Sequence, residues 1–123
     1  MKLLILDDDP SCTSAMSQYF AARGYDLEVA SELEQAEALL LNGSFDAVIT
    51  DVRLSNLQQA EGLMLLGFIR ERALTTRVMV VTAYDVNTIR DEAMRLGAEH
   101  FFVKPVSLER VAALLDGGVR NAD

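Results

Sequence analysis

Two groups of acidic residues in this chain directly follow short apolar runs. Three consecutive aspartates, residues 7–9, come after apolar residues 3–6, and Asp51 comes after residues 47–50, an apolar run closed by a threonine. Runs of this length are typical of strands buried on both faces of a parallel sheet. Ligands of such sheets bind beyond the carboxyl ends of the strands, where strand order reverses. We therefore expect the two groups of acids to meet at one edge of a sheet.

Crowded carboxylates repel one another, so one of them normally takes up a proton. A bound divalent cation removes that problem, and ligands that are all oxygen favour Mg²⁺ (or Mn²⁺). Such a metal also neutralises the charge that develops during phosphoryl transfer. A carboxylate nucleophile such as Asp51 would then form an acyl phosphate.

Two further polar residues stand at the ends of apolar runs. Thr82 closes the run of residues 78–82, and Lys104 follows residues 101–103. The hydroxyl would point into the same crevice, and the ammonium would offer a point charge for phosphate. Taken singly, a threonine is usually a strand former and a lysine is usually solvated. Their agreement with the acids at one edge favours a shared site.

The elements that must position these residues alternate between short apolar runs and longer helical stretches. This alternation predicts an α/β fold, a doubly wound five-stranded parallel sheet with five helices. The flavodoxin-like strand order 2-1-3-4-5 suits the length. We expect one domain over residues 1–118, with 119–123 as a C-terminal tail or the start of a linker. The expected strands are residues 2–6, 27–30, 47–50, 78–82 and 101–103, and the expected helices are residues 10–22, 31–41, 62–73, 86–96 and 107–115.

Composition limits the class of protein. The chain has 123 residues, half of them hydrophobic, which suits one domain with a real core. Its formal net charge of −8 argues against direct binding of nucleic acid. The apolar runs are too short to cross a membrane. The single cysteine, Cys12, cannot form an internal disulfide, and no signal segment opens the chain, so we expect a cytoplasmic location.

Four segments carry a resemblance to a known family. They are LLILDDDP at residues 3–10, AVITDVRL at 47–54, VVTA at 80–83 and GAEHFFVKP at 97–105. In this order, and across nearly the whole chain, they resemble the receiver domains of bacterial two-component response regulators. The resemblance implies a phosphorylation-controlled signalling switch within a phosphorelay. It also implies no turnover enzyme, only limited autophosphorylation and autodephosphorylation.

The resemblance implies a role for each acid of the site. Asp51 matches the phosphoacceptor that becomes an aspartyl phosphate. Asp8 matches the direct Mg²⁺ ligand, and Asp7 matches the acid that acts on the metal-bound waters. The backbone carbonyl of Arg53 matches the third protein ligand of the metal.

The same resemblance implies a phosphoryl-binding lysine and two switch residues. Lys104 matches the lysine, and its bond to Pro105 matches one that is usually cis. Thr82 matches the hydroxyl that moves onto the phosphoryl group. Phe101 matches an aromatic switch position that is often Tyr in relatives, although a plain core aromatic explains it equally well.

Partners also follow from the resemblance. A histidine kinase or phosphotransfer protein would supply the phosphoryl group. The face of the fourth helix, fifth strand and fifth helix would meet a downstream protein or an output domain, with homodimerisation on phosphorylation as a further possibility.

The sequence departs from the pattern of this family at Ser55, where relatives commonly carry Pro. The loop of residues 55–61 is expected to be longer than theirs by roughly three residues, a modest closure cost.

Three alternatives remain open on the residues alone. A phosphohydrolase of the haloacid-dehalogenase type has an Asp-x-Asp pair after a strand, a spacing that Asp7 and Asp9 reproduce, although the rest of that pattern is missing. A flavodoxin-like electron carrier needs a hydroxyl- and glycine-rich phosphate loop, where this chain has acids that would repel the flavin phosphate. A degenerate receiver would act only as a protein-docking module.

Overall fold

The computed structural model describes residues 1–51, 61–72, 75–83 and 87–117, in which strands alternate with helices. All strand pairs are parallel, in the order β2-β1-β3-β4-β5. The predicted α/β fold and strand order are therefore confirmed. The elements are β1 (Lys2–Leu6), α1 (Pro10–Ala22), β2 (Asp26–Ala30), α2 (Leu33–Asn42), β3 (Ala47–Thr50), α3 (Glu61–Glu71), β4 (Arg77–Thr82), α4 (Asn87–Arg95), β5 (His100–Val103) and α5 (Leu108–Gly117).

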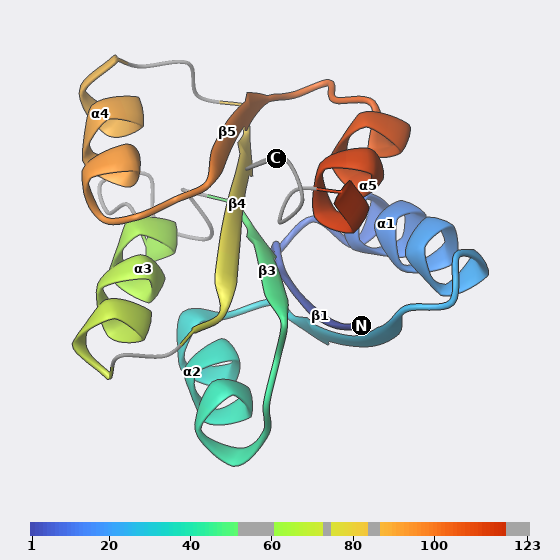
Figure 1. The fold of residues 1–123 in the computed structure, drawn as a ribbon, viewed down its shortest axis with the longest axis horizontal. Helices are drawn as coiled ribbons and strands as arrows, with labels where there is room; N and C mark the ends of the chain where they lie inside the picture. The colour runs from blue at the N-terminus through green and yellow to red at the C-terminus, as the bar shows by residue number, and fades with distance from the viewer. Residues whose placement is uncertain (52–60, 73–74, 84–86, 118–123) are drawn as a thin grey trace.

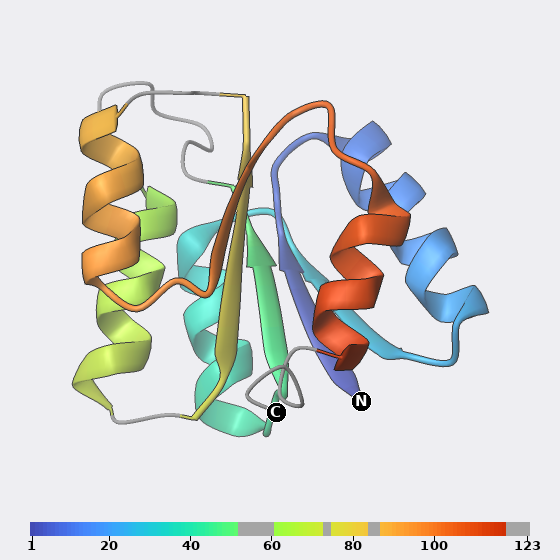
Figure 2. The ribbon, with the colours of Figure 1, turned by 45° about the horizontal axis from the view of Figure 1, so that its top comes forward.

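The sheet is the middle of three layers (Figure 1). Helices α1 and α5 lie on one of its faces, and α2, α3 and α4 lie on the other, as the turned view in Figure 2 also shows. In the sheet, β2 lies on one side of β1 and β3 lies on the other, so the chain crosses β1 between β2 and β3. The reversal of strand order therefore falls between β1 and β3, where a ligand site is expected in such a sheet.

Side chains of the strands alternate between two buried clusters, one under each helical layer. Because both faces of the sheet are covered, the central strands β1, β3 and β4 are apolar at nearly every position instead of at every second one. This explains the continuous apolar runs in the sequence. The cluster under α2, α3 and α4 takes Leu4, Leu6, Val48, Val78 and Val80 from the strands, and the cluster under α1 and α5 takes Leu3, Ile5, Ile49, Met79 and Val81.

Short-range signals fix most helix ends. Helix α1 begins at Pro10 because the Asp9 carboxylate accepts the Ser11 backbone N–H at 3.0 Å, which satisfies a donor that the helix itself leaves unpaired. Gly24 follows that helix with a φ of 91°, and Gly97 follows α4 with a φ of 101°. Both values lie in the left-handed region that glycine adopts without steric cost.

Several element ends differ from the sequence prediction by one or two residues. Helix α2 begins at Leu33, not at Ser31. The Gln35 side chain reaches back and accepts the Ser31 backbone N–H at 3.0 Å, which places Ser31 before the helix. Gly43 ends that helix as expected, in extended conformation with a φ of −153°.

Some predictions fall on residues outside the described ranges. These are the domain boundary at residues 118/119, Arg53, Ser55 and most of the loop of residues 55–61. Among the described helices, none has both the length and the apolar character that crossing a membrane requires.

Packing of α3 against the sheet gives a first testable prediction. Leu66 on α3 is 1% exposed, whereas Leu41 on α2 is 61% exposed. Leu66→Ala should lower the free energy of unfolding by about 2–5 kcal/mol because it leaves a cavity in the core. Leu41→Ala, the same change at the surface, should alter it by no more than about 0.5 kcal/mol. Urea unfolding measures both, and similar losses in the two variants would contradict this description of the core.

Candidate functional site

Two buried carboxylates share one ammonium at the carboxyl edge of the sheet. Asp7 follows β1, Asp51 follows β3, and Lys104 follows β5. Lys104 Nζ donates to Asp7 Oδ2 at 2.9 Å and to Asp51 Oδ2 at 3.0 Å. Asp7 is 3% exposed and Asp51 is 8% exposed. The structure thus brings together three predicted site residues that are far apart in the sequence.

Main-chain hydrogen bonds of the sheet hold these residues in place. The pairing continues one residue past each strand: Asp7 N–H donates to Ala30 O at 3.1 Å, and Asp51 N–H donates to Leu6 O at 3.0 Å. Lys104 N–H donates to Thr82 O at 2.7 Å. The site therefore stands on a rigid scaffold, which is what precise placement of reacting groups requires. The Lys104–Pro105 peptide bond is cis, as the resemblance implied.

The charge balance at the site depends on Lys104. Burial by itself lowers the pKa of the Lys104 ammonium, but the hydrogen bonds to Asp7 and Asp51 outweigh it, so its pKa lies above the ordinary value for lysine. The ammonium is therefore fully charged at neutral pH. One positive charge faces two carboxylates, which leaves the buried pair with excess negative charge.

The other two aspartates of the acidic run differ in their surroundings. Asp8 is exposed beside the buried Asp7. Asp9 caps α1, and hydrogen bonds, first from the Ser11 hydroxyl and then from the Ser11 backbone N–H, lower the pKa of its carboxyl group. The Asp9 N–H in turn donates to Asp7 Oδ1 at 3.0 Å and so orients the Asp7 carboxylate. Asp9 therefore serves as the N-cap of α1.

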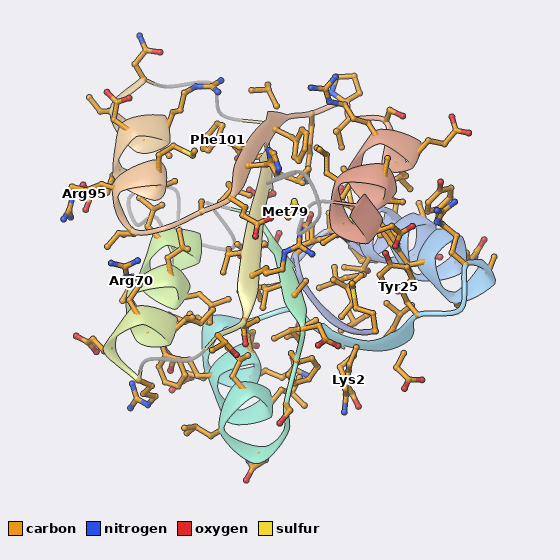
Figure 3. All side chains as sticks on the ribbon, in the orientation of Figure 1. Lys2, Tyr25, Arg70, Met79, Arg95 and Phe101 are labelled. Atoms are coloured by element: carbon orange, nitrogen blue, oxygen red, sulfur yellow. The ribbon has the colours of Figure 1, made fainter. Side chains whose placement is uncertain are left out.

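The two predicted switch residues lie on one face of the sheet. Thr82 is fully buried at the end of β4 and shares strand parity with Val80, which faces α3 and α4. Phe101 pairs with Val80 across to β5 and packs on the same cluster. Figure 3 shows Phe101 between α4 and β5. The Arg90 guanidinium lies 4.6 Å from the centre of the Phe101 ring, a cation–π contact.

Sequence reasoning did not anticipate the contacts of Arg90 and Cys12. A polar residue on an exposed helix gives no local signal of the strand it will meet, so Arg90 passed unnoticed. Cys12 is a single small residue of α1, and its position in the sequence does not indicate what it contacts. Its sulfur lies 3.6 Å from Lys104 Nζ, and its thiol donates to Asp9 Oδ2 at 3.4 Å. Burial raises the pKa of this thiol, so it is protonated at neutral pH.

The donor chemistry at this edge suits a hard divalent cation. The acidic side chains there offer only oxygen atoms, and Asp7 and Asp51 share the single charge of Lys104 while Asp8 is exposed beside them, so negative charge is in excess. Within the described ranges, no three histidine, cysteine, aspartate or glutamate side chains are grouped closely enough to hold a metal ion. In this arrangement Asp7 and Asp51 are bridged by lysine, and the Arg53 carbonyl lies outside the described residues.

Comparison with known proteins matches this geometry to one family. The family model described as response regulator receiver domain matches residues 3–116. The response regulator protein FleR of Pseudomonas aeruginosa is 35% identical over 121 residues, which cover 98% of this chain and 24% of FleR. The chain spans 24% to 46% of the length of the first curated relatives it matches.

Solved structures share the fold at lower identity. A two-component response regulator from Clostridium difficile superposes with a TM-score of 0.89 at 21% identity, covering 100% of this chain and 98% of that one. The response regulator protein TrrA from Thermotoga maritima, solved in complex with Mg²⁺–BeF, gives a TM-score of 0.80 at 23% identity, covering 94% of this chain and 96% of that one. These comparisons do not favour the phosphohydrolase or the docking-only alternative.

Removal of the Lys104 ammonium tests its role as the shared counter-charge. Lys104→Met should lower the free energy of unfolding at pH 7 by about 3 kcal/mol, because two buried carboxylates lose their cation. The stabilisation by this charge is fully present below the ordinary lysine pKa of 10.5 and is lost only as pH rises through the raised folded value. A measurement at pH 7 therefore captures all of it.

Removal of one of the two carboxylates should offset the effect of this variant, because less negative charge is then left without its cation. Adding Asp51→Asn to Lys104→Met should recover part of the loss at pH 7. Urea unfolding of the single and double variants at pH 7 checks this, and no recovery in the double variant would show that Lys104 acts through packing alone.

Proposed function

The chain belongs to the response regulator receiver domain family, a family of phosphoacceptor signalling switches, and we propose that its phosphoacceptor is Asp51. The observation that supports this proposal most directly is the position of the Lys104 ammonium, whose Nζ lies 3.0 Å from Asp51 Oδ2 and 2.9 Å from Asp7 Oδ2. A phosphoryl group on Asp51 would find that ammonium within hydrogen-bonding distance. The family match and the position of Asp51 at the β1/β3 reversal support the same assignment.

The proposed reaction is transfer of a phosphoryl group from a histidine kinase or a phosphotransfer protein. A carboxylate oxygen of Asp51 attacks phosphorus in line, and the bond from phosphorus to the donor histidine nitrogen breaks. Asp51 becomes an acyl phosphate, while Lys104 holds a phosphoryl oxygen. Limited autophosphorylation from small donors and limited autodephosphorylation belong to the same proposal, in which the domain acts as a switch.

We further propose that the acids hold Mg²⁺ (or Mn²⁺). Asp8 and Asp51 would bind it directly with the backbone carbonyl of Arg53, and Asp7 would act through its waters. When bound, the metal neutralises charge on the phosphoryl oxygens. The excess negative charge of the three aspartates over Lys104 supports this, as does the Mg²⁺–BeF complex of the neighbour TrrA.

Signalling follows from a local change of charge. The new phosphoryl group attracts the Thr82 hydroxyl, and Phe101, on the same face of the sheet, can then move toward the space that is left. This shifts the population between two states of the α4–β5–α5 face. A downstream protein or an output domain would bind that face, and homodimerisation on phosphorylation is part of the proposal. The location proposed is the cytoplasm, which suits a chain with one cysteine.

Phosphorylation by a small donor tests the acceptor. Asp51→Asn should abolish labelling by acetyl phosphate in the presence of Mg²⁺, because the amide is not a nucleophile. Asp91→Asn, the same change at an exposed position of α4, should leave labelling unaltered. Intact-protein mass spectrometry counts the added phosphoryl group. Undiminished labelling of the Asp51 variant would overturn the assignment.

Metal affinity tests the role of Asp8 without any phosphodonor. Asp8→Asn should weaken Mg²⁺ binding about tenfold or more, because a charged direct ligand is lost. Asp91→Asn serves again as the matched control and should bind Mg²⁺ as the wild type does. Isothermal titration calorimetry measures the dissociation constants. Equal affinity in all three proteins would remove Asp8 from the ligand set.

A further inference from the structure

A cavity of about 420 Å³ adjoins the site, between α1 and the segment that joins β5 to α5. Its volume lies within the range of about 300–1,000 Å³ that small-molecule pockets occupy. Figure 2 shows α1 and α5 together on this face of the sheet. The walls are mostly apolar and include Cys12, Ala15, Met16, Val81, Lys104 and Leu108.

Lys104 joins this cavity to the candidate site. The residue forms part of the wall, while its Nζ lies 3.0 Å from Asp51 Oδ2. Cys12 also lines the cavity, and its sulfur lies 3.6 Å from the same nitrogen. An oxygen atom bound to that ammonium would therefore stand at the mouth of an apolar space.

A molecule that binds the Lys104 ammonium and also fills the apolar cavity must be anionic at one end and apolar at the other. The anionic end would bind Lys104 beside Asp51, and the apolar end would contact Met16, Val81 and Leu108. A nucleotide does not meet this requirement, because its polar base and sugar would have to lie against the apolar walls of the cavity. A short-chain acyl phosphate does, since its phosphoryl group carries the charge and its acyl chain is a hydrocarbon.

We propose that this cavity receives the acyl chain of short-chain acyl phosphates, so that Asp51 accepts a phosphoryl group from butyryl phosphate faster than from acetyl phosphate. The inference rests on the proposed role of Asp51 as phosphoacceptor. A carboxylate oxygen of Asp51 forms a bond to phosphorus, the bond between phosphorus and the acyl oxygen breaks, and butyrate leaves with the electron pair. No proton or electron is exchanged with a third molecule.

The two donors make a sharp comparison because their leaving groups have nearly the same basicity. A difference in rate therefore reports contact of the chain with the protein. Burial of one methylene group favours binding by a factor of about four. Wild type should react with butyryl phosphate at least about fourfold faster than with acetyl phosphate, measured as second-order rate constants at low donor concentration.

Ala15→Phe fills the cavity from an exposed position of α1 that touches neither carboxylate. It should abolish the preference for butyryl phosphate, so that the two donors react at similar rates. Gln18→Phe places the same ring on an exposed position of α1 away from the cavity and should retain the preference. Equal rates with both donors in wild type, or a preference that survives in Ala15→Phe, would overturn the inference.

Thiol labelling gives a second measurement that needs no phosphoryl transfer. Cys12 is the only cysteine in the chain and lines the cavity, so alkylation by a small maleimide reports on access to it. Butylphosphonate should slow this reaction more than methylphosphonate does in wild type. An equal effect of the two phosphonates would count against an acyl site.

The outcomes separate this inference from the proposed function. If acetyl phosphate labels wild type but not Asp51→Asn, the phosphoacceptor role is upheld. Absence of a chain-length preference in that same experiment would then contradict the acyl site alone. Labelling of Asp51→Asn at the wild-type rate would instead contradict both.

Discussion

Burial of two like charges beside one another is the constraint on which this domain depends. Asp7 and Asp51 stand at the end of the sheet, nearly without solvent, and only a cation can make that arrangement tolerable. Lys104 supplies one, with a hydrogen bond to each carboxylate. Because the lysine offers a single charge, the site remains electronegative and is ready for a further cation. The chemistry and the folding of this edge are therefore governed by the same electrostatic balance.

The sheet satisfies this constraint by holding its carboxyl edge rigid. Strands buried on both faces lose any freedom to slip, because a shift by one residue would turn every side chain to the other cluster. Main-chain hydrogen bonds extend one residue beyond the strands and fix the backbones of Asp7, Asp51 and Lys104. The positions of the charged groups are therefore set by the packing of apolar strand side chains several residues away.

The proposed coupling to a partner surface depends on contacts that can change, unlike the rigid carboxyl edge. Phe101 is only partly buried, and its ring is held between the core and the Arg90 guanidinium. A cation–π contact of this kind contributes about 0.5–1 kcal/mol at an exposed site, far less than a core side chain. In the proposed switch the ring would therefore change position at small cost, and Thr82, fully buried on the same face, would respond to the charge at Asp51.

The sequence by itself determined the order of elements, the strand order and the presence of Asp7, Asp51 and Lys104 at one edge of the sheet. This is possible because strands buried on both faces of the sheet appear in the sequence as continuous apolar runs. In addition, the carboxyl ends of parallel strands all lie at one edge of the sheet. Only the tertiary structure decided which groups touch. The bridge from Lys104 to both carboxylates, the cavity beside Cys12 and the contact of Arg90 with Phe101 join residues from separate elements. Such contacts depend on side-chain geometry across the packed layers, for which local residue patterns carry no signal.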